Sequence, residues 1–164
     1  MKRIRIIIAD GHEVIRYRLH TFLTTQPNWE VVGEAQNGFD AVWLAVNHTP
    51  DLAILDLSLS GLNGLEVASL IRETNADIKI LLLSMPDLNE LEEEGIAAGV
   101  TKVLSKASAG RVLVETIQEI CEGTLSEVLV PVDTPLPALK TGLPDSRFVR
   151  LGQTNPFFSN PLQP

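Results

Sequence analysis

The chain has 164 residues, which is enough for one domain with a substantial core and an extension beyond it. Hydrophobic residues make up 45% of the sequence, which excludes an intrinsically disordered chain. The net charge of −8 arises within residues 1–122, which hold 10 Lys and Arg against 18 Asp and Glu, so we expect no direct binding of nucleic acid.

Five short apolar runs predict β-strands. Four are rich in isoleucine, leucine and valine, at 4–9, 30–35, 52–57 and 78–84, and a weaker fifth lies at 102–105. Several are apolar at consecutive positions, which is typical of a parallel sheet covered by helices on both faces.

Segments with helical spacing alternate with these runs. Ile15, Leu19, Phe22 and Leu23 lie on one face of a predicted helix, and the same spacing recurs at 40–47, 65–73, 88–99 and 109–123. Five strands alternating with five helices predict a doubly wound α/β fold with a mostly parallel, five-stranded sheet. Sites in such folds lie at the carboxyl ends of the strands.

The sequence changes character at Gly123. Residues 123–164 hold 7 of the 10 prolines and show no helical period. We therefore divide the chain into a domain at 1–122 and a proline-rich tail or extended arm at 123–164. The tail lacks a basic cluster and a recognition helix, so we expect no DNA-binding domain there.

The sequence also indicates a compartment. Cys121 is the single cysteine, so an intrachain disulfide is impossible and a reducing environment fits. The apolar run after the basic residues at 2–5 stops at Asp10, too early for a signal peptide. No run approaches the roughly 18 apolar residues that cross a bilayer. We expect a cytoplasmic protein without a membrane partner.

Four polar residues end or follow predicted strands. Asp10 follows the first, Asp56 ends the third, Ser84 ends the fourth, and Lys106 follows the fifth. Each has an ordinary explanation alone, since an acid or a serine there is usually a helix cap and a lysine is usually solvated. Two carboxylates, a hydroxyl and an ammonium at one edge form a far more specific combination.

This pattern resembles the receiver domain of two-component response regulators, in particular the LuxR/NarL type. The matching segments are "IRIIIADGHEVIR", "VVGEAQNG", "PDLAILDLSLSGLNGLEV", "ILLLS" and "AAGVTKVLSKAS", and the resemblance covers about residues 3–122. It implies a (βα)5 flavodoxin-like fold that accepts a phosphoryl group from a histidine kinase or phosphotransfer protein. It also implies a downstream protein partner and a possible homodimer, but no turnover as an enzyme.

The resemblance implies a role for each residue at the strand ends. Asp56 is the expected phosphoacceptor, Ser84 the switch hydroxyl, and Lys106 the cation that pairs with the phosphoryl group. Asp10, Asp56 and the backbone carbonyl of Ser58 are the expected ligands of Mg²⁺. This set is chemically coherent, because phosphoryl transfer requires positioning and charge neutralisation, and Mg²⁺ prefers oxygen ligands.

The chain departs from the family pattern at Gly11 and Val103, and also at Ser60 and Ala107, which stand where receivers often carry proline. Receivers of this type usually read Asp-Asp-His where this chain reads Asp10-Gly11-His12, so one acid is missing and weak Mg²⁺ binding is expected. Glu13 is a candidate replacement, although an acid in the first turn of a helix also suits the helix dipole. His12 is interpreted as an ordinary loop residue. Val103 stands where receivers commonly carry the aromatic residue that reports the switch.

Two receiver functions remain open. Gly11 and Val103 favour a degenerate receiver that signals without efficient phosphorylation, whereas Asp56, Ser84 and Lys106 favour a phosphorylated one. A haloacid-dehalogenase-type phosphatase is a remote alternative, because Ser58 occupies the position of its second acid. A flavodoxin-like FMN protein is equally remote, because "DGHEV" (10–14) is a poor phosphate loop.

Overall fold

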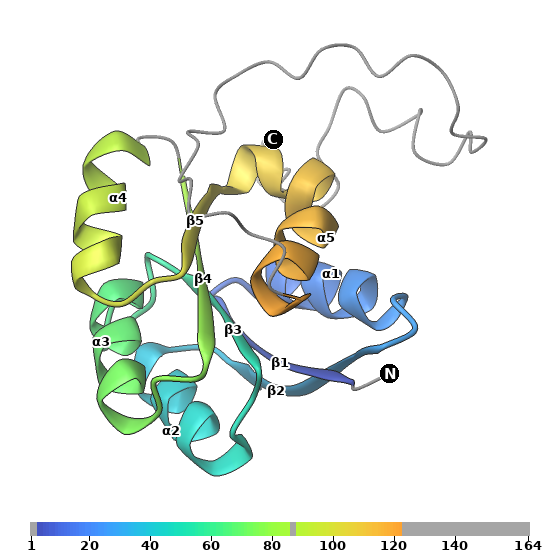
Figure 1. The fold of residues 1–164 in the computed structure, drawn as a ribbon, viewed down its shortest axis with the longest axis horizontal. Helices are drawn as coiled ribbons and strands as arrows, with labels where there is room; N and C mark the ends of the chain where they lie inside the picture. Colours follow the sequence, from blue (N-terminus) through green and yellow to red (C-terminus); the bar gives the residue numbers. More distant parts are fainter. Residues whose placement is uncertain (1–2, 86–87, 123–164) are drawn as a thin grey trace.

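The computed structural model describes residues 3–85 and 88–122 as five strands alternating with five helices (Figure 1). The elements are β1 (Ile4–Ala9), α1 (Glu13–Thr24), β2 (Trp29–Ala35), α2 (Gly38–His48), β3 (Leu52–Asp56), α3 (Gly64–Thr74), β4 (Lys79–Ser84), α4 (Leu88–Ala97), β5 (Lys102–Ser105) and α5 (Lys106–Glu122). The tail at 123–164 lies outside the described residues, so its prediction is not tested.

The strands form one parallel sheet in the order β2-β1-β3-β4-β5. The chain starts with β1, adds β2 beside it at one edge, and then crosses to add β3, β4 and β5 in turn on the opposite side of β1. The prediction of a doubly wound, five-stranded α/β fold is confirmed.

Helices cover both faces of the sheet, which explains the consecutive apolar residues of the strands. Ile6 and Ile8 pack with α1 and α5 on one face, while Ile7 and Ala9 pack with α2, α3 and α4 on the other. Figure 1 shows this division into two helical layers. No helix of the described segments is long and apolar enough to cross a membrane.

Local sequence signals fix the starts of the helices on one side of the sheet. Asn37 accepts a hydrogen bond from the backbone N–H of Asp40 at the start of α2. Asn63 and Glu66 form a capping box at the start of α3, in which each side chain accepts from the other residue's backbone N–H. These caps satisfy backbone donors that a helix leaves unpaired.

The observed boundaries differ most at α5. Helical spacing predicted a start near Ala109, but the helix begins at Lys106, immediately after β5. The absence of a loop places Lys106 at the carboxyl edge of the sheet, where a side chain in the first turn can reach the other strand ends.

Candidate functional site

The four polar residues predicted at the strand ends are all buried at the carboxyl edge of the sheet. Exposed fractions are 1% for Asp10, 3% for Asp56, 3% for Ser84 and 4% for Lys106. Charged side chains are almost never buried to this degree unless they are paired. The burial therefore requires compensating contacts among them.

Lys106 supplies that compensation. Its Nζ lies 2.8 Å from Oδ2 of Asp10 and 2.9 Å from Oδ1 of Asp56, so one ammonium bridges two carboxylates. With both acids ionised, the trio carries a net charge of −1. An incompletely neutralised buried site attracts a cation.

One carboxylate oxygen of Asp56 is not used in hydrogen bonding among the described residues. Its Oδ2 is buried and has no hydrogen-bond partner among the described residues, whereas Oδ1 contacts Lys106. Leaving a buried acceptor unpaired costs about 1–3 kcal/mol. An atom with that cost and with free lone pairs is suited to bind a cation or attack an electrophile.

Asp10 is fixed in the loop between β1 and α1. Its Oδ1 accepts a hydrogen bond of 2.8 Å from the backbone N–H of His12 and lies 3.2 Å from Nδ1 of the same residue. The backbone carbonyl of Asp10 accepts a 2.8 Å hydrogen bond from the buried Arg16. These contacts hold the carboxylate toward β3.

The loop after β3 is closed tightly behind Asp56. The backbone N–H of Gly64 donates to the carbonyl of Leu57 at 2.9 Å, and Gly61 adopts a positive φ of 80°. A Cβ at Gly64 would lie 2.6 Å from the carbonyl oxygen of Asp56, so only glycine fits there without displacing the phosphoacceptor candidate.

The hydroxyl of Ser84 is bonded to the backbone rather than to a carboxylate of the site. Its hydroxyl donates a 2.6 Å hydrogen bond to the carbonyl of Met85, and it makes no bond with Asp56 in the described part of the chain. Ser84 is nevertheless at the correct edge, because Asp56 and Leu83 are paired neighbours in β3 and β4. Its role as a switch hydroxyl stays a prediction.

Gly11, which stands where receivers usually carry an acid, leaves open space at that position. Gly11 is exposed, and a Cβ there would meet only the carbonyl of Gln36, at 3.7 Å. Glu13 is the exposed first residue of α1, and Ser58 is exposed in the turn after β3. The proposed metal roles of Glu13 and the Ser58 carbonyl stay predictions.

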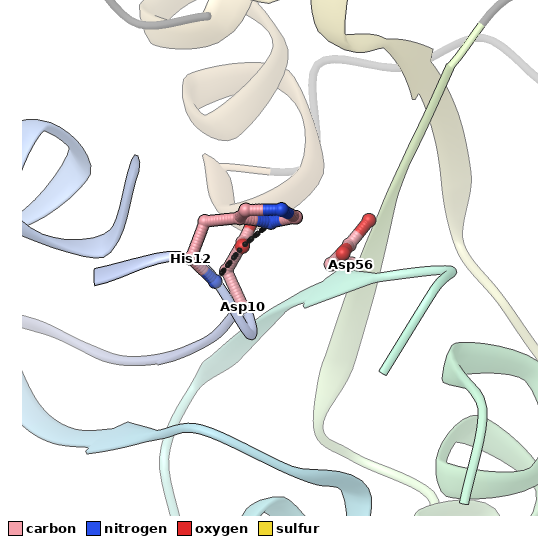
Figure 2. A group of neighbouring side chains, drawn as sticks. All are labelled: Asp10, His12 and Asp56. Atoms are coloured by element: carbon pink, nitrogen blue, oxygen red, sulfur yellow. Dashed lines mark hydrogen bonds and ion pairs between the residues drawn. The ribbon is translucent and has the colours of Figure 1, made fainter. Parts of the chain in front are cut away.

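His12 joins the acids at the site, although sequence reasoning set it aside. Asp10, His12 and Asp56 each offer one ligand atom within 4.8 Å of the others (Figure 2). Figure 2 shows the imidazole beside the Asp10 carboxylate, with the Asp56 carboxylate facing the pair from β3. This group fits a divalent cation, because two buried carboxylates share one ammonium and Asp56 has an unpaired oxygen.

Val103 is buried in the core between the sheet and α4. It is 9% exposed and belongs to the hydrophobic cluster that includes Leu91 of α4. A Cβ at Gly95 would lie 3.2 Å from its Cγ2. The valine therefore fills a packed position beside α4 and has no rotatable ring to signal a change at the site.

The chain is similar to proteins of a known family. Residues 6–118 match the family model of the response regulator receiver domain. The chain is 34% identical over 120 residues to the transcriptional regulatory protein LiaR of Bacillus subtilis, and 32% identical over 129 residues to the nitrate/nitrite response regulator protein NarL of Escherichia coli. These matches cover 73% and 77% of this chain but only 57% and 60% of the two relatives.

Solved structures agree. A LuxR-family two-component response regulator from Aurantimonas matches with a TM-score of 0.71 and 29% identity, covering 74% of this chain and 87% of that one. The response regulator domain of Thermotoga maritima CheB matches with a TM-score of 0.68 and 25% identity, covering 74% and 98%. The chain belongs to the response regulator receiver domain family, and within it to the LuxR/NarL type.

Proposed function

We propose that Asp56 accepts a phosphoryl group from a histidine kinase or phosphotransfer protein, and that the receiver passes the signal on through protein contacts. The observation that carries this proposal is the ammonium of Lys106 bridging Asp10 and Asp56, with Oδ2 of Asp56 left unpaired. A nucleophile with free lone pairs beside a fixed cation is the arrangement that phosphoryl transfer requires.

The transfer replaces one bond to phosphorus with another. An oxygen of Asp56 forms a bond to phosphorus while the bond from phosphorus to the donor's histidine nitrogen breaks, and the donor imidazole keeps that electron pair. Lys106 stays within reach of the carboxylate and neutralises the charge that the new phosphoryl oxygens bring. Asp10 is released in part from Lys106 and becomes available for a cation.

We further propose that Asp10, Asp56 and the backbone carbonyl of Ser58 hold Mg²⁺, weakly because Gly11 supplies no carboxylate. When bound, the cation neutralises phosphoryl oxygens during transfer. The support is the charge of the trio and the unpaired oxygen of Asp56.

Ser84 is our candidate for the switch. Its hydroxyl is committed to the carbonyl of Met85, so a phosphoryl group on Asp56 must compete with that 2.6 Å hydrogen bond for the donor. Rotation of Ser84 would then release the carbonyl of Met85. Because Val103 has no ring to follow, we propose that this change at Met85 carries the read-out.

A receiver that signals without phosphorylation is the weaker alternative, since the two acids and the lysine are all present and in contact. The family match also leaves the phosphatase and FMN alternatives without support. Phosphoryl acceptance is then the only chemistry that we assign, without turnover as an enzyme.

The remaining proposals concern the whole chain, which spans less than two thirds of the length of the relatives LiaR and NarL. We propose that 1–122 forms the receiver, in line with the match at 6–118 and the end of α5 at Glu122, and that 123–164 adds no DNA-binding domain. A cytoplasmic location, no direct contact with nucleic acid, and a homodimer stay proposals.

The test is incorporation of phosphate from a small donor. The full chain is incubated with acetyl phosphate, with and without Mg²⁺, and intact mass spectrometry detects the gain of one phosphoryl group. We expect a slow, Mg²⁺-stimulated adduct that the Asp56→Asn variant lacks. An adduct that persists in Asp56→Asn, or no adduct at any Mg²⁺ concentration, contradicts the proposal.

A further inference from the structure

We propose that the imidazole of His12 is a metal ligand, and that the cation site formed by Asp10, His12 and Asp56 prefers a transition-metal dication such as Zn²⁺ or Co²⁺ to Mg²⁺. The inference rests on the proposed function in one respect, which is the location of the cation site. It changes the ligand set of that site from oxygen alone to two oxygens and one nitrogen.

Geometry is the first support. Ligand bonds of about 2.0–2.2 Å to zinc place neighbouring ligand atoms roughly 3–3.5 Å apart. Nδ1 of His12 already lies 3.2 Å from Oδ1 of Asp10, and an Asp56 oxygen lies within 4.8 Å of both ligand atoms. The His12 side chain is 72% exposed, so a small rotation can close the remaining distance without repacking.

The second support is an unsatisfied acceptor on one of the three ligands. Oδ2 of Asp56 is buried without a hydrogen-bond partner in the described segments. Lys106 contacts the other oxygen of Asp56 and Oδ2 of Asp10, so it leaves Oδ1 of Asp10 on the side of His12. Each acid therefore keeps one carboxylate oxygen that Lys106 does not contact, and the Asp10 oxygen lies beside the imidazole.

Ligand chemistry then selects the metal. Mg²⁺ requires near-octahedral oxygen coordination, and Gly11 removes an oxygen donor from this site. Imidazole nitrogen suits zinc, nickel and iron, and affinity rises from manganese toward copper for a given site. Three protein ligands also leave a position open for water or a phosphoryl oxygen.

One of the two neutral tautomers of His12 allows Nδ1 to act as a ligand. In the tautomer that carries its proton on Nε2, Nδ1 has a free lone pair for the cation. The backbone N–H of His12 still donates to Oδ1 of Asp10 at 2.8 Å, so the carboxylate keeps its orientation when the ring turns from hydrogen bonding to coordination.

The experiment is calorimetric titration of the full chain with Co²⁺, Zn²⁺ and Mg²⁺, without any phosphodonor. His12→Ala is compared with His20→Ala, a matched control, because His20 is also on the surface and its Nδ1 lies 2.6 Å from a carboxylate oxygen of Glu34. The visible spectrum of bound Co²⁺ provides a second readout, since its d–d bands change when a ligand is lost or replaced.

We expect wild-type protein to bind Co²⁺ and Zn²⁺ more tightly than Mg²⁺. His12→Ala should weaken Co²⁺ and Zn²⁺ by about tenfold or more and alter the Co²⁺ spectrum, but change Mg²⁺ affinity by less than about threefold. Unchanged Co²⁺ affinity in His12→Ala overturns the inference, as does loss of binding in His20→Ala instead.

The two proposals fail separately. Co²⁺ binding that depends on His12, in a protein that takes no phosphate on Asp56, would support the inference and contradict the proposed function. A phosphate adduct on Asp56, in a protein whose Co²⁺ binding ignores His12, would do the reverse.

Discussion

Replacing Gly11 with aspartate should restore strong Mg²⁺ binding. The residue is exposed, and a Cβ there would meet only the carbonyl of Gln36, at 3.7 Å, so the side chain fits without strain. The added charge takes the site from −1 to −2. Without metal, repulsion between a third carboxylate and Asp10 should lower the free energy of unfolding by about 1 kcal/mol. The figure is that for two charges about 4 Å apart in a water-like dielectric, because position 11 is exposed.

Metal should more than offset that cost. If the wild-type dissociation constant for Mg²⁺ is on the order of 10 mM, then about 10 mM Mg²⁺ stabilises the wild type by about 0.4 kcal/mol. Binding that is tenfold to a hundredfold tighter raises the stabilisation to about 1.4–2.7 kcal/mol in Gly11→Asp.

Urea denaturation at increasing Mg²⁺ concentration measures both effects. Gly11→Asn is the matched control, because it has nearly the same size and shape but no charge. Gly11→Asp should be less stable than Gly11→Asn without metal and gain more from Mg²⁺. An equal Mg²⁺ response in the two variants would refute the view that Gly11 weakens the site.

Three further substitutions are tested by urea denaturation, two at the site and one in the contact between α3 and the loop before β5. Among the described residues, Lys106 is the one cation that contacts both Asp10 and Asp56, and Lys106→Met should lower the free energy of unfolding by about 3–5 kcal/mol. Adding Asp56→Asn to that variant should recover at least half of the lost stability. A loss below about 1 kcal/mol in Lys106→Met would contradict the ion-pair account. Gly64→Ala places a methyl group 2.6 Å from the Asp56 carbonyl and should cost about 1–3 kcal/mol and slow phosphorylation, so normal stability would be inconsistent with the close approach. Arg72→Ala removes hydrogen bonds from α3 to the loop before β5 and should cost about 1–3 kcal/mol, whereas no change would show that the arginine does not hold that loop.

The fold follows closely from local sequence. A strand such as β1 is buried on both faces, so its apolar residues are consecutive. Neither the spacing nor the composition of that run favours a helix instead. The start of α5 was less predictable. Lys106, Ala107 and Ser108 lack the apolar spacing of the later turns, so only the structure shows that the helix includes them.

The site was predictable where a topological rule applied. Asp10, Asp56 and Lys106 follow or end parallel strands, and such strands end at one edge of the sheet, so their proximity follows from sequence order. The contacts of His12 and Arg16 were missed, because they depend on how the loop after β1 turns. The available signal for Arg16 was its position three residues before Leu19 and seven before Leu23, on the face of α1 that packs inward.

The most direct measurement locates the phosphoryl group. Protein treated with acetyl phosphate and Mg²⁺ is reduced with borohydride, which converts an aspartyl phosphate to homoserine, and the modified residue is identified by peptide mass spectrometry. The account predicts homoserine at position 56 and no conversion of Asp10. Conversion at another residue, or at none while unreacted protein remains folded, would contradict it.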